Sequence, residues 1–408
     1  MELVVSYWEG WDAGDRRATG RLTKAAARRR DAAGEQYTVL VESRNVPRML
    51  IDVAWNHHYC AVWELDEVLR RKAKYVYRRL ADDQIFLTKT IEWTYGAEKQ
   101  PEFHPHAGTR MVEAETDGRT RIGVAPEGEG GNLGETMQMV PADGLWRPVP
   151  AFGDWRELFT GNLETLRSAI LLDRPDPVAP GAALPVEQRP WRPPRPLRPS
   201  RPDLMFGPGT AYDIPRFGRA TVEVIDAGRL RMPTGRLIAA DPGWLRSPID
   251  ESELPAFTVH VAPGEYPVSL SVVRFDDNPR HVRVAAAKLT VRTEPAATWE
   301  PALRPGEDPR SLDEGQFFGF GVDSGTGCFV DAAALPAIGH LLDDVYESLF
   351  PEVGGTRRAV LESGANVISF SSGWGDGAYP TWLGRTEGGQ VACFIADMLV
   401  LDDATVAT

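Results

Sequence analysis

The pattern of apolar and polar residues divides the chain into two halves of different character. In the second half, short apolar runs bounded by Gly, Pro or Asp are typical of strands. These predicted strands cover residues 221–224, 237–240, 257–261, 266–274, 282–291, 319–322, 367–371, 381–385 and 390–395. An apolar stripe predicts one helix over residues 336–350. The pattern therefore predicts a β-rich sandwich or curled sheet with one helix.

The first half combines strand-like and helical patterns. Residues 37–42 and 49–54 predict a hairpin, and further strands are predicted at 85–93 and 109–115. Apolar residues at helical spacing predict helices over 61–80 and 154–172. A short basic helix is predicted at 16–33, where its arginines and lysine either face an anionic partner or form a solvated surface. This half is predicted to be an α+β domain with a modest sheet.

A proline-rich segment lies between the halves. Residues 174–202 hold prolines interleaved with arginines, as in RPWRPPRPLRPSRP, and such density favours extended polyproline II. We interpret it as a linker between domains at 1–173 and 203–408, although it would also suit an SH3-like or acidic partner. Two domains fit a chain of 408 residues, because single cores stop growing at about 250–300 residues.

Composition excludes several classes of protein. The formal net charge of −13 argues against a dedicated nucleic-acid binder, which needs a basic surface. No apolar run reaches the length of a membrane helix, and the first residues lack a signal-peptide pattern. Three cysteines are too few and too scattered for a disulfide framework. We expect a cytoplasmic protein that does not contact membranes.

Two Gly-rich loops in the second half carry the candidate chemistry. Residues 318–331, FGFGVDSGTGCFVD, place two carboxylates around a Ser-Gly-Thr-Gly turn, and residues 369–380, SFSSGWGDGAYP, combine a carboxylate with aromatic rings. We hypothesise that both loops line one hollow. The candidate ligand-binding residues are Asp323, Ser324, Gly325, Thr326, Gly327, Trp374, Gly375, Asp376, Gly377 and Tyr379.

Three carboxylates are candidate metal ligands. Asp323, Asp331 and Asp376 would offer the oxygen atoms that Mg²⁺ or Ca²⁺ prefers, and Gly-rich loops let such groups converge. Their spacing does not match an EF-hand. The alternative is that each Asp caps a tight turn by accepting hydrogen bonds from backbone amides.

Other chemical signals in the sequence are weaker. The sequence GVDSGTG resembles the phosphate loop of the actin and sugar-kinase superfamily, but too few residues follow it for two lobes. His57, His58 and Cys60 are zinc-ligand types, yet neighbouring strand positions point to opposite faces. Cys328 has no histidine nearby in sequence that would activate a thiol.

Several motifs in the second half resemble one known family. TGRLIAADP, PGEYPVSLSVVR, AAAKLTV and TWEPA, together with the two Gly-rich loops, follow the order seen in the bacterial domain family DUF4241. The resemblance covers about residues 219–402. It implies no catalytic residues, because the function of that family is unknown.

Three functional hypotheses follow. The first is a binding or interaction module, of immunity or adaptor type, that presents the Gly/Asp/Trp loop surface to a protein or small molecule. The second is a metal-assisted hydrolase of a phosphorylated or nucleotide-like small molecule. The third places the function in the N-terminal half. Whether the protein is an enzyme stays open at this point, and the first hypothesis is preferred.

Overall fold

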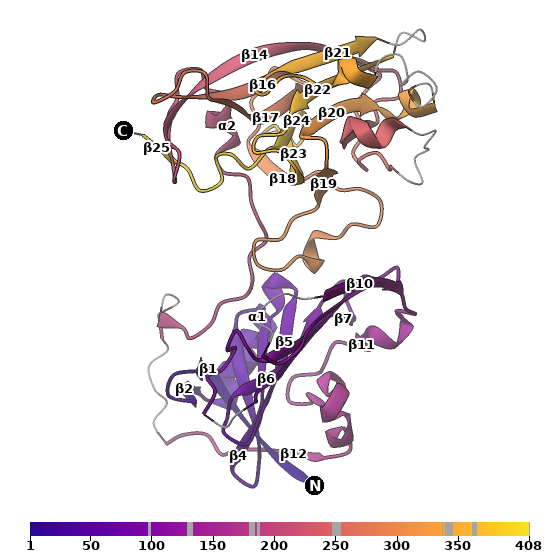
Figure 1. The fold of residues 1–408 in the computed structure, drawn as a ribbon. Coiled ribbons are helices and arrows are strands. Elements are labelled where there is room, and N and C mark those ends of the chain that lie inside the picture. The colour runs from indigo at the N-terminus through magenta and orange to yellow at the C-terminus, as the bar shows by residue number, and fades with distance from the viewer. Residues whose placement is uncertain are drawn as a thin grey trace. The chain divides into compact units, whose positions relative to one another are not determined.

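The protein is β-rich, with few helices, and forms two compact units (Figure 1). The computed structural model describes residues 1–96, 99–128, 134–178, 184–185, 188–246, 254–336, 338, 346–360 and 365–407. One unit comprises Met1–Arg195 with Arg310–Asp313, and the other comprises Pro196–Pro309 with Glu314–Thr408. Of the residues predicted as a linker, those up to Arg195 thus belong to the N-terminal unit. Within the described ranges, no helix has the length and apolar character needed to cross a membrane.

A twelve-stranded sheet dominates the N-terminal unit. Its strands are β1 (Glu2–Asp12), β2 (Arg17–Leu22), β3 (Tyr37–Ser43), β4 (Val46–Ala54), β5 (Tyr59–Leu65), β6 (Arg71–Arg78), β7 (Gln84–Thr94), β8 (Gly108–Ala114), β9 (Arg119–Ala125), β10 (Gly134–Met139), β11 (Trp146–Pro148) and β12 (Ile170–Asp173). From β3 to β10 each strand pairs antiparallel with the next, and β1 lies between β3 and the parallel strand β12. The sheet is larger than the modest one predicted.

Irregular pairing bends this sheet. Register shifts fall between Val41 and Glu42, between Glu64 and Leu65, and between Val76 and Tyr77. Each shift increases the local twist, so successive strands curl rather than form a flat layer. One face packs against a core that includes Trp155 and Phe159, while the other carries two smaller apolar clusters, one around Leu40 and Leu50 and one around Ala61 and Val76.

The predicted helix at 61–80 is wrong, since these residues form β5, a turn and β6. In β5, Cys60 and Val62 enter the main core, whereas Ala61 packs in a small cluster on the other side. Because both faces of the sheet are covered here, the period-two alternation of a strand is hidden in a nearly continuous apolar run. Asp66 then closes the turn by accepting hydrogen bonds from the N–H groups of Val68 and Arg70.

The other two helix predictions in this half need partial correction. Only Lys24–Ala33 forms helix α1, where Thr23 caps the first turn and Gly34 ends the helix at φ 71°. The residues before it pair with β1 as strand β2. Residues 154–172 form two 3₁₀ helices, η3 (Arg156–Leu158) and η4 (Gly161–Leu166), followed by the start of β12. Gly161 at φ 55° interrupts the apolar pattern that predicted one long helix.

The end of the predicted linker packs onto the N-terminal unit. The indole of Trp191 donates a hydrogen bond to the hydroxyl of Thr38 at 2.8 Å, and its ring centroid lies 6.1 Å from that of Tyr59. Gln36 donates to the carbonyl of Trp191. This part of the proline-rich segment is therefore fixed on the sheet.

The C-terminal unit contains a nine-stranded and a four-stranded sheet. The larger sheet holds β13 (Ala211–Ile214), β14 (Gly218–Met232), β16 (Gly264–Phe275), β17 (Val282–Thr290), β18 (Thr298–Pro301), β19 (Gly319–Val322), β23 (Gly377–Arg385), β24 (Val391–Asp397) and β25 (Thr405–Val406). The smaller sheet holds β15 (Leu237–Ala240), β20 (Thr326–Asp331), β21 (Thr356–Val360) and β22 (Asn366–Ser371). All but one of the predicted strands are found, the exception being 257–261, which the structure describes without a strand.

The smaller sheet is covered on both faces. Phe329 and Phe370 pack into the core that the larger sheet supplies, whereas the alternate residues Cys328 and Val330 pack into a second core with Leu335. This alternation makes the unit a layered β structure with the four-stranded sheet inside. Most of the helix predicted at 336–350 lies outside the described residues, and its described end is the 3₁₀ helix η9 (Tyr346–Leu349).

The three cysteines lie in three different cores. Cys60 packs in the core of the N-terminal unit, Cys393 in the large core of the C-terminal unit and Cys328 in its second core. All three are buried free thiols. Burial raises the pKa of Cys328 strongly and raises that of Cys393 to about 11, so neither is a ready nucleophile.

Candidate functional site

The two Gly-rich loops of the C-terminal unit are neighbours. The N–H of Gly325 donates to a carboxylate oxygen of Asp376 at 3.1 Å, and the N–H of Ser372 donates to the carbonyl of Gly325 at 3.0 Å. The pairing of β20 with β22 places Thr326 opposite Ser371 and so brings the loops together. The segments that sequence reasoning singled out therefore share one region.

A residue that the sequence analysis missed holds the first loop. Asp241, 1% exposed, follows β15 and accepts hydrogen bonds from the N–H groups of Asp323 and Ser324, both at 2.8 Å. Its other oxygen accepts from the hydroxyl of Ser324 at 2.7 Å and from the N–H of Gly243 at 2.6 Å. The carboxylate is thus surrounded by donors, and its role is to fix the turn.

The first loop offers little to a ligand. The side chain of Asp323 is exposed, but Thr326 is buried. A Cβ atom at Gly327 would lie 2.8 Å from the ring of Phe370, so this glycine is needed for close packing. Ser324 uses its hydroxyl on Asp241. Among the predicted residues of this loop that the structure describes, only Asp323 has an exposed polar side chain that makes no hydrogen bond holding the loop.

Asp331 lies away from the other two predicted metal ligands. It ends β20 opposite Leu237, whereas the two Gly-rich loops meet at the start of that strand. It is 0% exposed and accepts hydrogen bonds from the hydroxyl of Thr234 at 2.7 Å and from the N–H of Ala333 at 2.9 Å. Five residue steps along β20 separate it from Thr326, where the loops meet, by roughly 17 Å at about 3.3 Å per residue.

The predicted set Asp323, Asp331 and Asp376 therefore does not converge on one ion. Across the described ranges, no group of three or more His, Cys, Asp or Glu side chains is placed to hold a metal. Asp331 instead caps a turn, which is the alternative that the sequence left open. The hypothesis of a metal-assisted hydrolase therefore loses the converging carboxylates on which it was based.

Tyr379 and the turn between β22 and β23 form one rigid unit. The phenol hydroxyl of Tyr379, which is buried, lies 2.9 Å from the carbonyl oxygen of Ser372 and 2.7 Å from that of Gly375. Burial raises the pKa of this phenol. Gly373 has φ 57°, and a Cβ atom there would lie 2.8 Å from Val400. Tyr379 therefore supports the turn and is not exposed to a partner.

The turn presents Trp374 to solvent within an aromatic patch, which we define as Phe217, His281, Arg283 and Trp374, and which lies over the buried ring of Phe275. The rings of Phe217 and Trp374 stack at 4.1 Å with an interplanar angle of 22°, and those of Phe275 and His281 stack at 4.2 Å. The Arg283 guanidinium lies 5.3 Å from the Trp374 ring centre. Three separate turns and β17 thus build one preassembled surface.

Exposure distinguishes the patch from the rest of the core. Trp374 is 40% and Phe217 is 42% exposed, although both rings are stacked and ordered by neighbours. Trp382, on the following strand β23, is 2% exposed and donates to Asp397 at 3.2 Å. Sequence reasoning found Trp374 but not its partners, because Phe217 and His281 lie in distant turns that only the fold brings together.

The C-terminal unit is thus a β-rich domain, and its candidate site is an exposed aromatic patch. Residues 230–396 match the model of the family described as "Protein of unknown function (DUF4241)", and the N-terminal half matches no family model. This confirms the resemblance seen in the motifs, over a slightly shorter span. Searches of curated proteins and of solved structures found no match.

Proposed function

We propose that the C-terminal unit is a protein-binding module whose contact surface is the aromatic patch. The observation that carries this proposal is the stacked pair Phe217 and Trp374, which leaves two large rings about 40% exposed on rigid turns. Trp and Arg are the residues most often found at the energetic centres of protein interfaces. Because the turn is already fixed, binding costs little conformational entropy.

The charges around the patch indicate the chemistry of the partner. Arg283 lies over Trp374, and the exposed Arg216 and Arg280 belong to the adjacent turns. Of the nearby carboxylates, Asp376 accepts from Gly325, and Asp276 lies 3.9 Å from Arg219. The partner we propose is a protein surface with an apolar anchor residue flanked by carboxylates. An immunity-type inhibitor or a signalling adaptor would use such a surface.

The buried thiols support a reducing setting for this binding. Cys60, Cys328 and Cys393 lie in three different cores and so do not pair with one another. Free cysteines of this kind are typical of proteins of the cytoplasm.

The experiment compares two exposed tryptophans of the same unit. Proteins retained from a cell lysate by the wild-type chain would be identified, produced separately and titrated against purified W374A and W244A. Trp244 is 59% exposed and lies outside the patch, so it controls for the loss of an exposed ring. W374A is expected to weaken binding by about tenfold or more, and W244A by less than about twofold.

A partner that binds W374A as tightly as the wild type would overturn the proposal. R283M provides an independent check, because it leaves Trp374 in place and removes the charge above its ring. It is expected to weaken binding less than W374A does.

A further inference from the structure

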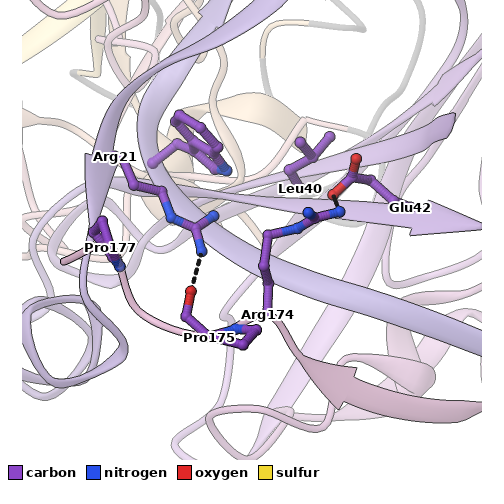
Figure 2. A pocket seen from close by; sticks show the side chains of 7 residues that line it. Arg21, Leu40, Glu42, Arg174, Pro175 and Pro177 are labelled. Atoms are coloured by element: carbon purple, nitrogen blue, oxygen red, sulfur yellow. Dashed lines mark hydrogen bonds and ion pairs between the residues drawn. The ribbon is translucent and has the colours of Figure 1, made fainter. Parts of the chain in front are cut away.

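A separate cavity lies in the N-terminal unit, between three strands and the segment that follows β12. Its volume is about 340 Å³, and it is open to solvent. Figure 2 shows the side chains that line it. Strands β1, β2 and β3 and this segment supply its walls, which include Trp8, Arg21, Leu40, Glu42, Arg174 and Pro175. The volume is at the lower end of the range for small-molecule sites.

Two guanidinium groups lie in this cavity with a single carboxylate. Arg174 donates to Glu42 at 2.8 Å and to Asn45 at 3.2 Å. Arg21 donates only to the carbonyl of Pro175, at 3.3 Å, among the hydrogen bonds of the described residues (Figure 2). The lining groups therefore carry one positive charge in excess.

The environment of Arg21 is unfavourable for a lone cation. Burial lowers the pKa of Arg21, and the charge of Arg174 lowers it further. Its guanidinium lies 4.9 Å from the ring centre of Trp8, which offsets part of that cost. Outside the lining residues, Asp173 pairs with the ammonium of Lys24. Asp176 accepts a hydrogen bond from the backbone N–H of Lys24, and its charge, like that of Glu42, offsets part of the lowering of the Arg21 pKa.

Each guanidinium also keeps an unused donor. The Nη1 atom of Arg21 and the Nε atom of Arg174 are buried and have no hydrogen-bond partner in the part of the chain that the structure describes. A buried donor without an acceptor is unfavourable, so an acceptor placed beside it would be favoured.

We propose that this cavity binds a small anion whose carboxylate or phosphate group lies between Arg21 and Arg174. The forked N–H donors of arginine match both head groups in geometry and charge. The bound anion compensates the excess positive charge and supplies the missing acceptors. Trp8 and Leu40 form the apolar wall against which the body of the ligand packs.

This proposal concerns one residue of the basic segment at 16–33. The sequence suggested an anionic partner for a helix with several arginines along one side. In the fold, Arg21 lies on β2 and faces the cavity, whereas Arg28 stays on α1 with its guanidinium 5.3 Å from the ring centre of Phe152. The anion would therefore meet one residue of that segment and Arg174, not a helical surface.

Calorimetric titration of the full chain tests the proposal. One arm uses inorganic phosphate and the other uses benzoate, each against sodium chloride at matched ionic strength. We expect saturable binding of at least one of these anions, with a dissociation constant below about 20 mM. The anion that binds more tightly identifies the head group.

Variants locate the site. R21M and R174M are each expected to weaken binding by about tenfold or more, whereas R21K, which keeps the charge without the fork, should have a smaller effect. R29M is the matched control, because Arg29 is exposed on α1 outside the cavity. Thermal unfolding confirms that each variant is folded, and R174M serves if R21M does not fold.

Two results would overturn the proposal. One is the absence of binding by both anions up to about 20 mM. The other is binding that R29M weakens as much as R21M and R174M do, since this would indicate general attraction to positive charge.

Discussion

The Gly-rich loops and the aromatic patch share one turn of the C-terminal unit, yet they use their side chains in opposite ways. Asp241 is almost fully buried and accepts hydrogen bonds from three backbone N–H groups and from the hydroxyl of Ser324, all within its own unit. Trp374 is ordered by its neighbours but remains 40% exposed. The comparison teaches that the buried carboxylates Asp241 and Asp331 hold turns, whereas the exposed rings remain available for contact.

The largest expected effect on stability comes from removing the carboxylate of Asp241. We expect D241A to lower the free energy of unfolding by about 4 kcal/mol, because it removes a buried carboxylate that accepts from the part-buried N–H groups of Asp323 and Ser324. Chemical denaturation measures the change. D323A is the matched control and should stay within about 0.5 kcal/mol of wild type, because its side chain is exposed. Equal losses in the two variants would contradict a structural role that is specific to Asp241.

A second prediction concerns how stability changes with pH. It rests on the buried carboxylate of Asp397, which accepts a hydrogen bond from Trp382. Burial raises the pKa of Asp397 from 3.8 to about 6. The folded protein therefore holds this proton more tightly than the unfolded chain, so the stabilisation is present below about pH 4 and is lost as the pH rises through 6. At 1.36 kcal/mol per unit, the loss amounts to about 3 kcal/mol.

The variant D397N isolates this effect. Its free energy of unfolding, relative to wild type, is expected to rise by about 3 kcal/mol between pH 4 and pH 7, as measured by denaturation at each pH. D323N, at an exposed position, should show no such trend. A difference between D397N and wild type that does not change with pH would show that Asp397 titrates normally.

The smallest expected effect belongs to the patch itself. W374A should lower the free energy of unfolding by only about 1 kcal/mol, because the ring is partly exposed and loses mainly its stacking on Phe217. Thermal or chemical unfolding would measure it. A loss as large as that of D241A would mean that Trp374 is a core residue and would weaken its assignment to a binding surface.

The sequence was sufficient for eight strands of the C-terminal unit and for the two loops, but it did not predict β13, β18, β21 and β25. Local signals define both, since Gly, Pro and Asp bound short apolar runs. The sequence was insufficient where both faces of a sheet are buried, as in β5, because the alternation that marks a strand is then lost.

Contacts between residues that lie far apart in the sequence could not be predicted either. Asp241 bonds to Ser324, which is 83 positions away, and nothing in the motif AADP distinguishes such a carboxylate from an ordinary turn residue. The aromatic patch likewise joins turns that lie far apart in the chain. These contacts depend on strand order, which propensity and local pattern do not determine.

Each of the three cysteines can report the opening of a different core. Cys60, Cys328 and Cys393 each occupy a different core, so a thiol reagent added to the native protein can react only when one of these interiors opens. Mass spectrometry of the labelled peptides would time the three openings separately. The wild-type chain thus carries its own reporters of local unfolding, without any introduced label.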